Sequence, residues 1–221
     1  MSVVVAIKKN NMVYLGADSQ VTRGGSRSSL SNVNNYKIWK VKGVEQCYMG
    51  AVGALRDSCV LRIINGFVRE IDAIHDDIDY EYVVNRIEPM IRDVLIEHKF
   101  VKEDNPYETM DSRFLFVYKN KIFTIEYGAV IEHDDFVVIG SGESEAVGSL
   151  LSLPKELDVN ERIIKAIKAS AAHDIYVDYP IILANTKDCN FEVITEKNER
   201  EFFQKGEKNE ENSNENSSEL R

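Results

Sequence analysis

The first two residues, Met1 and Ser2, could place a nucleophile and its base on a single residue. A small second residue permits removal of the initiator methionine, which would leave the Ser2 hydroxyl beside a free α-amine. An α-amine has a pKa of roughly 7.7 to 8.0, so near neutral pH it can accept the hydroxyl proton. The β-branched run at residues 3–7 follows directly, and a terminus held in a sheet is rigid. Simple processing of a commonplace serine is the alternative.

Asp18 is the first candidate for supporting that nucleophile. Residues 3–7 and 12–15 form an expected hairpin about Asn10-Asn11, and its second strand returns toward the start of the first. Asp18 ends that second strand in the segment GADSQVT and should therefore lie near Ser2. An Asp that only accepts backbone N–H groups in a turn is the competing interpretation.

Lys37 is the second candidate, in the expected strand YKIWKV. Alternation places Lys37 on one strand face with Trp39 and Val41, a setting in which a lysine would be buried. Paired with Asp18, it would stay charged and lower the pKa of the Ser2 amine. An edge lysine that reaches solvent remains open as an alternative, as does Lys40 in its place.

A glycine-containing turn in YMGAVGALRD supplies a candidate oxyanion hole. Gly50 and Gly53 join an expected strand to a helix, where the backbone can approach a ligand and N–H groups are unpaired. A helix cap alone would need only one of these glycines. The later GSGESE at 140–145 departs from a phosphate-binding loop, and the four histidines are too scattered for a zinc site. We therefore expect neither nucleotide nor metal at the site.

The order of elements predicts an α+β fold with stacked antiparallel sheets. Strands come in hairpin groups and helices in pairs, which favours a four-layered αββα sandwich over a doubly wound parallel sheet. Residues 16–35 have the composition of a loop. Further strands are expected at 36–41, 46–52, 112–127 (a hairpin about Lys119-Asn120), 136–140, 181–186 and 191–195, and helices at 54–71, 80–100 (with a kink at Pro89), 143–153 and 159–172.

Composition narrows the class of protein further. The 221 residues suffice for one sizeable core, and the net charge of −10 argues against nucleic acid as a partner. No apolar run is long enough to span a membrane, and the N-terminus lacks the order of a signal peptide, so we expect a soluble, cytoplasmic protein. Residues 1–204 form one expected domain, and the polar, acidic segment 205–221 is an expected disordered tail. Three separated cysteines suggest buried free thiols.

Taken together, the segment SVVVAIKKNNMVYLGADSQVT, the lysine of NYKIWKV, the turn MGAVGALRD and the later FVVIGSG resemble the proteasome β-subunit family. The resemblance is greatest to its bacterial HslV (ClpQ) peptidase branch and covers residues 2 to about 195. It implies an N-terminal-nucleophile hydrolase fold. It also implies stacked rings of identical subunits around a proteolytic chamber, and unfolded protein substrates delivered by an AAA+ unfoldase ATPase.

The resemblance also implies roles for particular residues. Ser2 falls at the nucleophile, Asp18 and Lys37 at the charged pair, and Gly53 at an oxyanion-hole N–H donor. Ser141 and Asp174 fall at or near supporting residues. The usual nucleophile is threonine, so serine keeps the hydroxyl but loses the methyl that restricts its rotamer. The segment from Asp18 to Lys37 is also about three residues longer than is typical of the bacterial branch.

No cofactor is implied for peptide hydrolysis. In the HslV branch a loop after the last long helix often holds a sodium ion. Here that loop reads AAHDIYVDYP, altered by Asp178 and Pro180, so the ion stays unassigned. The sequence thus predicts a ring-forming endopeptidase. A non-catalytic ring subunit that retains Met1, and an amidase of the same fold acting on small amides, are the alternatives.

Overall fold

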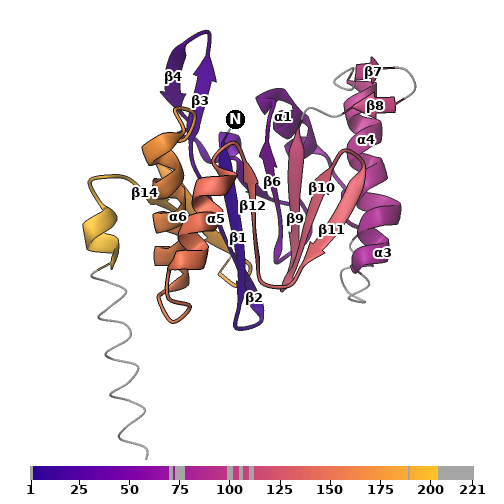
Figure 1. Cartoon of the computed structure of the whole chain (residues 1–221). Helices are drawn as coiled ribbons and strands as arrows, with labels where there is room; N and C mark the ends of the chain where they lie inside the picture. The colour runs from indigo at the N-terminus through magenta and orange to yellow at the C-terminus, as the bar shows by residue number, and fades with distance from the viewer. Residues whose placement is uncertain are drawn as a thin grey trace, which may run out of the picture.

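The structure is a computed structural model that describes residues 2–69, 72, 78–98, 102–104, 107–109, 112–188 and 190–203. Two five-stranded antiparallel sheets form its centre (Figure 1). The predicted tail, residues 205–221, lies outside the described residues, as does Cys189.

The first sheet has the strand order β12-β1-β2-β13-β14, and the second has the order β11-β10-β9-β6-β5. The strands of the first sheet are β1 (Val3–Lys9), β2 (Met12–Ala17), β12 (Phe136–Gly140), β13 (Ile181–Asn185) and β14 (Phe191–Ile194). Those of the second are β5 (Ile38–Lys40), β6 (Cys47–Val52), β9 (Arg113–Tyr118), β10 (Lys121–Glu126) and β11 (Ala129–His133). Short hairpins are formed by β3 (Gln20–Arg23) with β4 (Ser26–Ser29) and by β7 (Lys102–Asp104) with β8 (Tyr107–Thr109).

Helices cover the outer face of each sheet. Against the first sheet lie α5 (Glu143–Ser152) and α6 (Val159–His173). Against the second lie α1 (Leu55–Ile63) and a composite helix of α3 (Tyr80–Tyr82), the π-helical η2 (Val83–Ile87) and α4 (Glu88–Glu97). A 3₁₀ turn, η1 (Val33–Asn35), precedes β5. The predicted four-layered αββα sandwich is therefore confirmed.

Strand β1 shows how the sequence selects this packing. Val3, Val5 and Ile7 point into the cluster beneath α5 and α6, whereas Val4 and Ala6 point into the cluster between the two sheets. Successive strand residues face opposite sides, so a strand apolar on both faces must be covered on both. The apolar run at the N-terminus thus places β1 in the middle of the molecule and holds Ser2 at its end.

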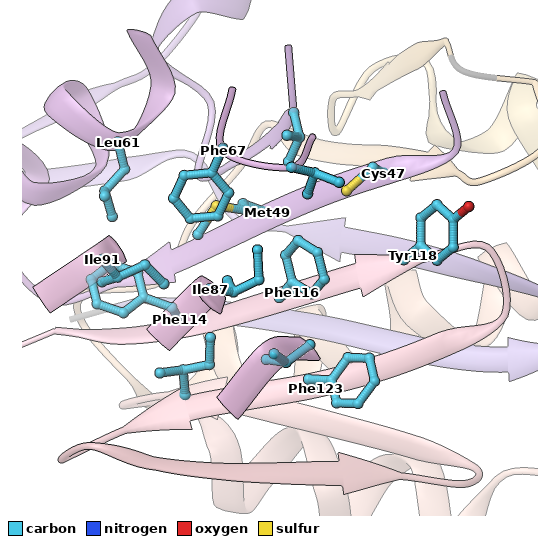
Figure 2. Packing of buried hydrophobic residues seen from close by; sticks show 14 of the residues in the cluster. Cys47, Met49, Leu61, Phe67, Ile87, Ile91, Phe114, Phe116, Tyr118 and Phe123 are labelled. Atoms are coloured by element: carbon cyan, nitrogen blue, oxygen red, sulfur yellow. The ribbon is translucent and has the colours of Figure 1, made fainter. Parts of the chain in front are cut away.

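The cluster on the outer face of the second sheet is built from large side chains (Figure 2). Phe114, Phe116 and Tyr118 alternate along β9 and pack with Phe123 of β10 and with Ile87 and Ile91 of the composite helix. Phe67 joins them from the segment after α1. This layer fixes β9 and β6, and β6 leads directly into Gly53.

Several predicted boundaries are wrong, each for a local reason. The helix expected over 54–71 ends at Ile63, because the chain becomes extended at Ile64 and Gly66 has a positive φ of 71°. Phe67 and Val68 nevertheless reach the core, which explains the helix-like apolar spacing. The segment expected as a loop, 16–35, contains the β3–β4 hairpin, which turns through Gly24 and Gly25 with φ of 54° and 83°.

Other predicted features agree with the structure. The hairpin about Lys119-Asn120 joins β9 to β10, and Pro89 lies in the first turn of α4, after the π-helical turn η2. Cys47 is a buried free thiol, but Cys59 is exposed, which corrects the expectation that it is buried. Every helix in the described part of the chain is too short or too polar to cross a membrane.

Two glycines give opposite predictions for stability. A Cβ on Gly16 of β2 would lie 2.2 Å from Ile163 Cγ2 of α6, so Gly16→Ala should push the helix off the sheet and cost about 1–3 kcal/mol. A Cβ on Gly148 of α5 meets no atom within 4 Å, so Gly148→Ala should stabilise the helix by about 1 kcal/mol. Denaturant unfolding of both variants beside the parent chain checks these signs. A neutral Gly16→Ala would contradict this packing of α6.

Candidate active site

Ser2 lies directly before β1 and is 4% exposed. Its backbone N–H donates to Ser141 Oγ at 3.0 Å, and its carbonyl oxygen accepts from the Gly142 N–H at 3.3 Å. The turn after β12 therefore holds both backbone groups of Ser2. The structure thus brings the predicted residues Ser2 and Ser141 together.

Gly140 makes this close approach possible. It has a φ of 123°, and a Cβ at this position would lie only 2.0 Å from the Ser2 carbonyl oxygen. A side chain is therefore excluded by both conformation and space. Arg113 of β9 braces the same turn by donating to the Gly140 carbonyl oxygen at 3.1 Å and to Glu143 at 2.8 Å. Sequence reasoning did not identify Arg113.

Asp18 and Lys37 form a buried ion pair beside Ser2. Lys37 Nζ lies 2.8 Å and 2.7 Å from the two carboxylate oxygens of Asp18 and also donates to the Gln20 carbonyl at 2.7 Å. Each Asp18 oxygen accepts one further bond, from the N–H of Val3 at 2.9 Å and of Gln20 at 3.0 Å. All three ammonium protons have acceptors, so the pair is satisfied and Lys37, not Lys40, occupies the site.

The placement of Lys37 corrects one detail of the sequence analysis. Lys37 precedes β5 instead of lying within it, and its ammonium crosses to the first sheet. Trp39 and Val41 pack on the outer face of the second sheet, so they do not share the surroundings of the Lys37 ammonium. The lysine is buried because the chain enters β5 at this point, and alternation within the strand is not the cause.

Burial acts on both members of the pair. Desolvation raises the pKa of Asp18 above its ordinary value, while the Lys37 charge and the hydrogen bonds from Lys37, Val3 and Gln20 oppose the rise. Desolvation lowers the pKa of Lys37, and the charges of Asp18 and Asp174 oppose the fall. Each charge therefore depends on the other, and removing one partner would leave an uncompensated buried charge.

Gly53 lies between β6 and α1 with a φ of 119°. Gly53 lines a pocket of about 270 Å³ that Ser2 and Lys37 also line. Among the described residues, nothing accepts a hydrogen bond from the Gly53 N–H. The remaining walls are mostly uncharged: Gln20, Val21, Thr22, Ala51, Val52, Ala54, Leu55, Ser58 and Tyr176. The pocket can thus hold a carbonyl oxygen against Gly53 beside the Ser2 side chain.

Asp174 is the C-cap of α6. Its Oδ1 accepts from the Tyr176 N–H at 2.9 Å, and its Oδ2 is buried with no hydrogen bond to the described residues. The effect of its charge on the Lys37 pKa places it within electrostatic range of the ion pair. Ser170 of α6 donates to the Gly142 carbonyl at 2.6 Å, which ties α6 to the turn that holds Ser2.

The loop considered for a sodium ion is anchored to the β3–β4 hairpin. The carbonyl oxygens of Ile175, Asp178 and Tyr179 accept bonds from Gln20 Nε2, the Ser19 N–H and Ser29 Oγ. These carbonyls are engaged within the protein, and the ion remains unassigned. In the described part of the chain, no three His, Cys, Asp or Glu side chains gather at a distance suited to a metal.

The four-layered fold is that of the N-terminal-nucleophile hydrolases, and the comparisons with known proteins agree. A family model described as proteasome subunit matches residues 2–184. The chain therefore belongs to the proteasome subunit family, and the resemblance seen in the sequence is confirmed. No curated protein sequence matches the chain significantly.

Solved structures share this fold at low sequence identity. Anbu (Gly-1 mutant) from Hyphomicrobium sp. strain MC1 is 16% identical with a TM-score of 0.65, covering 98% of this chain and 96% of its own. BPH from Thiobacillus denitrificans, in complex with epoxomicin, is 19% identical with a TM-score of 0.62, covering 87% and 99%. HslV from Trypanosoma brucei is 17% identical with a TM-score of 0.58, covering 83% and 98%.

Because Asp18 and Lys37 are buried together, removing Lys37 should lower the stability of the fold by an amount that depends on pH. Lys37→Met should cost about 3–5 kcal/mol near pH 7, because it leaves the Asp18 carboxylate buried and unpaired. Losing the lysine raises the folded-state pKa of Asp18 further above its unfolded value. The folded state then binds the proton more tightly, so stability falls as the pH rises and the cost should shrink as the pH falls toward about 4.

Urea unfolding between neutral and mildly acidic pH measures this dependence. The double variant Asp18→Asn with Lys37→Met removes both charges and should recover much of the loss. A cost for Lys37→Met that is independent of pH would contradict the buried ion pair.

Proposed function

We propose that this chain is an N-terminal-nucleophile endopeptidase with Ser2 as its nucleophile, active once Met1 has been removed. The observation that carries the proposal is the shared pocket, which Ser2, Lys37 and Gly53 all border. Nucleophile, charged group and N–H donor meet on three segments distant in sequence. Family membership supports the assignment.

In the proposed reaction, Ser2 Oγ attacks the peptide carbonyl while the Ser2 α-amine takes the hydroxyl proton. The positive charge of Lys37 favours the unprotonated amine and is itself held by Asp18. The developing oxyanion accepts from the Gly53 N–H. The amine returns the proton to the leaving nitrogen, and water then hydrolyses the acyl ester by the same route.

Ser141 and Asp174 act as supporting residues in this proposal. Ser141 Oγ already contacts the Ser2 nitrogen and can orient the amine of the mature chain. Asp174 adds negative charge that helps keep Lys37 protonated. Neither group needs a cofactor, so peptide hydrolysis requires only the chain's own residues and water.

The proposal extends to the assembly. Identical subunits would form stacked rings whose chamber isolates the sites, and an AAA+ ATPase would supply unfolded proteins. Family membership supports the rings. The competing functions are a scaffold subunit that keeps Met1 and an amidase outside a ring. Intact mass separates the scaffold, which keeps Met1, from the peptidase, which lacks it. The size of the assembly separates the amidase from the ring-forming peptidase.

Substitution of the nucleophile tests the mechanism. Ser2→Ala keeps the α-amine and removes only Oγ, so it should abolish peptide hydrolysis while assembly is unchanged. Ser2→Thr restores a hydroxyl with a more restricted rotamer and should stay active. Fluorogenic peptide turnover beside intact mass of each variant provides the readout, and the active forms should lack Met1. Turnover by Ser2→Ala would exclude this mechanism.

Epoxomicin, the ligand of the BPH complex, gives an independent check. An epoxyketone can add the hydroxyl at its ketone and the amine at its epoxide, so a stable adduct needs both on one residue. The parent chain should gain the full inhibitor mass, and Ser2→Ala should gain none.

Ring assembly predicts a large particle. Light scattering at micromolar concentration should give a mass of about a dozen subunits or more, and Ser2→Ala should give the same mass. A monomer of full activity would favour the amidase, whereas a ring that retains Met1 and lacks activity would favour the scaffold.

A further inference from the structure

The oxyanion donor belongs to the most flexible residue type in the site. Gly53 has no side chain to hold it, and a change in its backbone angles would turn the N–H away from the pocket. The preceding residue, Val52, is fixed because it pairs with Arg113 in the ladder between β6 and β9. The following residue, Ala54, is the N-cap of α1 and has no side chain that could accept a capping hydrogen bond. A contact from another segment must therefore hold the backbone on the C-terminal side of Gly53.

Ser112, the residue before β9, supplies that contact. Its Oγ accepts from the Ala54 N–H at 3.0 Å and donates to Asp57 Oδ2 at 2.6 Å. Asp57 is 2% exposed and Ser112 is 1% exposed, so the bond between them is shielded from water, and the bond from Ala54 is partly buried. The Asp57 carboxylate, which accepts only, orients the Ser112 hydroxyl so that a lone pair faces Ala54.

We propose that Ser112, oriented by Asp57, is a positioning residue for the oxyanion hole and holds the Gly53 N–H toward the pocket. Two consecutive residues at the start of β9 then hold both neighbours of Gly53: Arg113, the first residue of the strand, through Val52, and Ser112, which precedes the strand, through Ala54. Neither Ser112 nor Asp57 borders the pocket, so their effect passes through the backbone. This inference rests on the proposed peptidase function.

The test compares Ser112→Ala with two partner variants. Ser112→Ala should lower kcat by about 10-fold to 100-fold with KM nearly unchanged, because the donor is displaced without being lost. Ser112→Thr keeps the hydroxyl and should recover most of the rate. Thr186→Val is the matched control, since the buried Thr186 Oγ1 also accepts a backbone N–H, from Val13 at 3.1 Å, and does not line this pocket. It should leave kcat unchanged.

A second readout separates positioning from general support. A peptide boronate bound to Ser2 mimics the tetrahedral adduct, whereas a peptide with a methylene in place of the scissile carbonyl has no oxygen for Gly53 to bind. Ser112→Ala should weaken the boronate by the same factor as kcat/KM and leave the reduced peptide nearly unaffected.

The outcomes are distinct. Normal kcat in Ser112→Ala, equal loss of both ligands, or failure of Ser112→Thr to recover activity would overturn the positioning role alone. An inactive parent chain, or hydrolysis by Ser2→Ala, would overturn the proposed function and the positioning role with it.

Discussion

The buried contact between Asp18 and Lys37 is the interaction on which the site depends. Asp18 follows β2 of the first sheet, and Lys37 precedes β5 of the second, so their contact ties the two sheets together at the end that carries Ser2. The same carboxylate binds the N–H of Val3, the residue after the nucleophile. A buried pair is costly to desolvate, so in the proposed mechanism its role is to place a charge beside Ser2 more than to add net stability.

The site also requires segments of the backbone to pass close to Ser2. Gly140 lets the turn after β12 pass against the Ser2 carbonyl, and Gly53 lines the pocket beside Ser2. Both have positive φ and both lie at strand ends fixed by apolar packing behind them. The packed sandwich therefore holds the strand ends in fixed positions, and the two glycines adopt the backbone conformations that the site requires there.

Much of this arrangement could be predicted from the sequence. The β-branched N-terminal run and the Asn10-Asn11 turn predicted the hairpin that brings Asp18 to Ser2, and the glycine turn predicted Gly53 beside the pocket. What pattern analysis missed depends on contacts between distant segments. Ser112 has ordinary surroundings in sequence, and only the pairing of β9 with β6 places it against Ala54. The helix predicted through 71 failed because apolar spacing reports burial, and Phe67 is buried without being helical.

The central claim is that hydroxyl and base reside on the same N-terminal residue. Brief periodate treatment tests it directly, because periodate cleaves the bond between carbons that carry an amine and a hydroxyl, and Ser2 has this pair only when it is N-terminal. Intact mass and peptide hydrolysis are measured on the same sample, with Ser2→Ala reporting oxidation elsewhere. The account predicts that activity falls in proportion to the fraction of Ser2 converted. Full hydrolysis by chains whose Ser2 has been cleaved, or by chains that retain Met1, would contradict it.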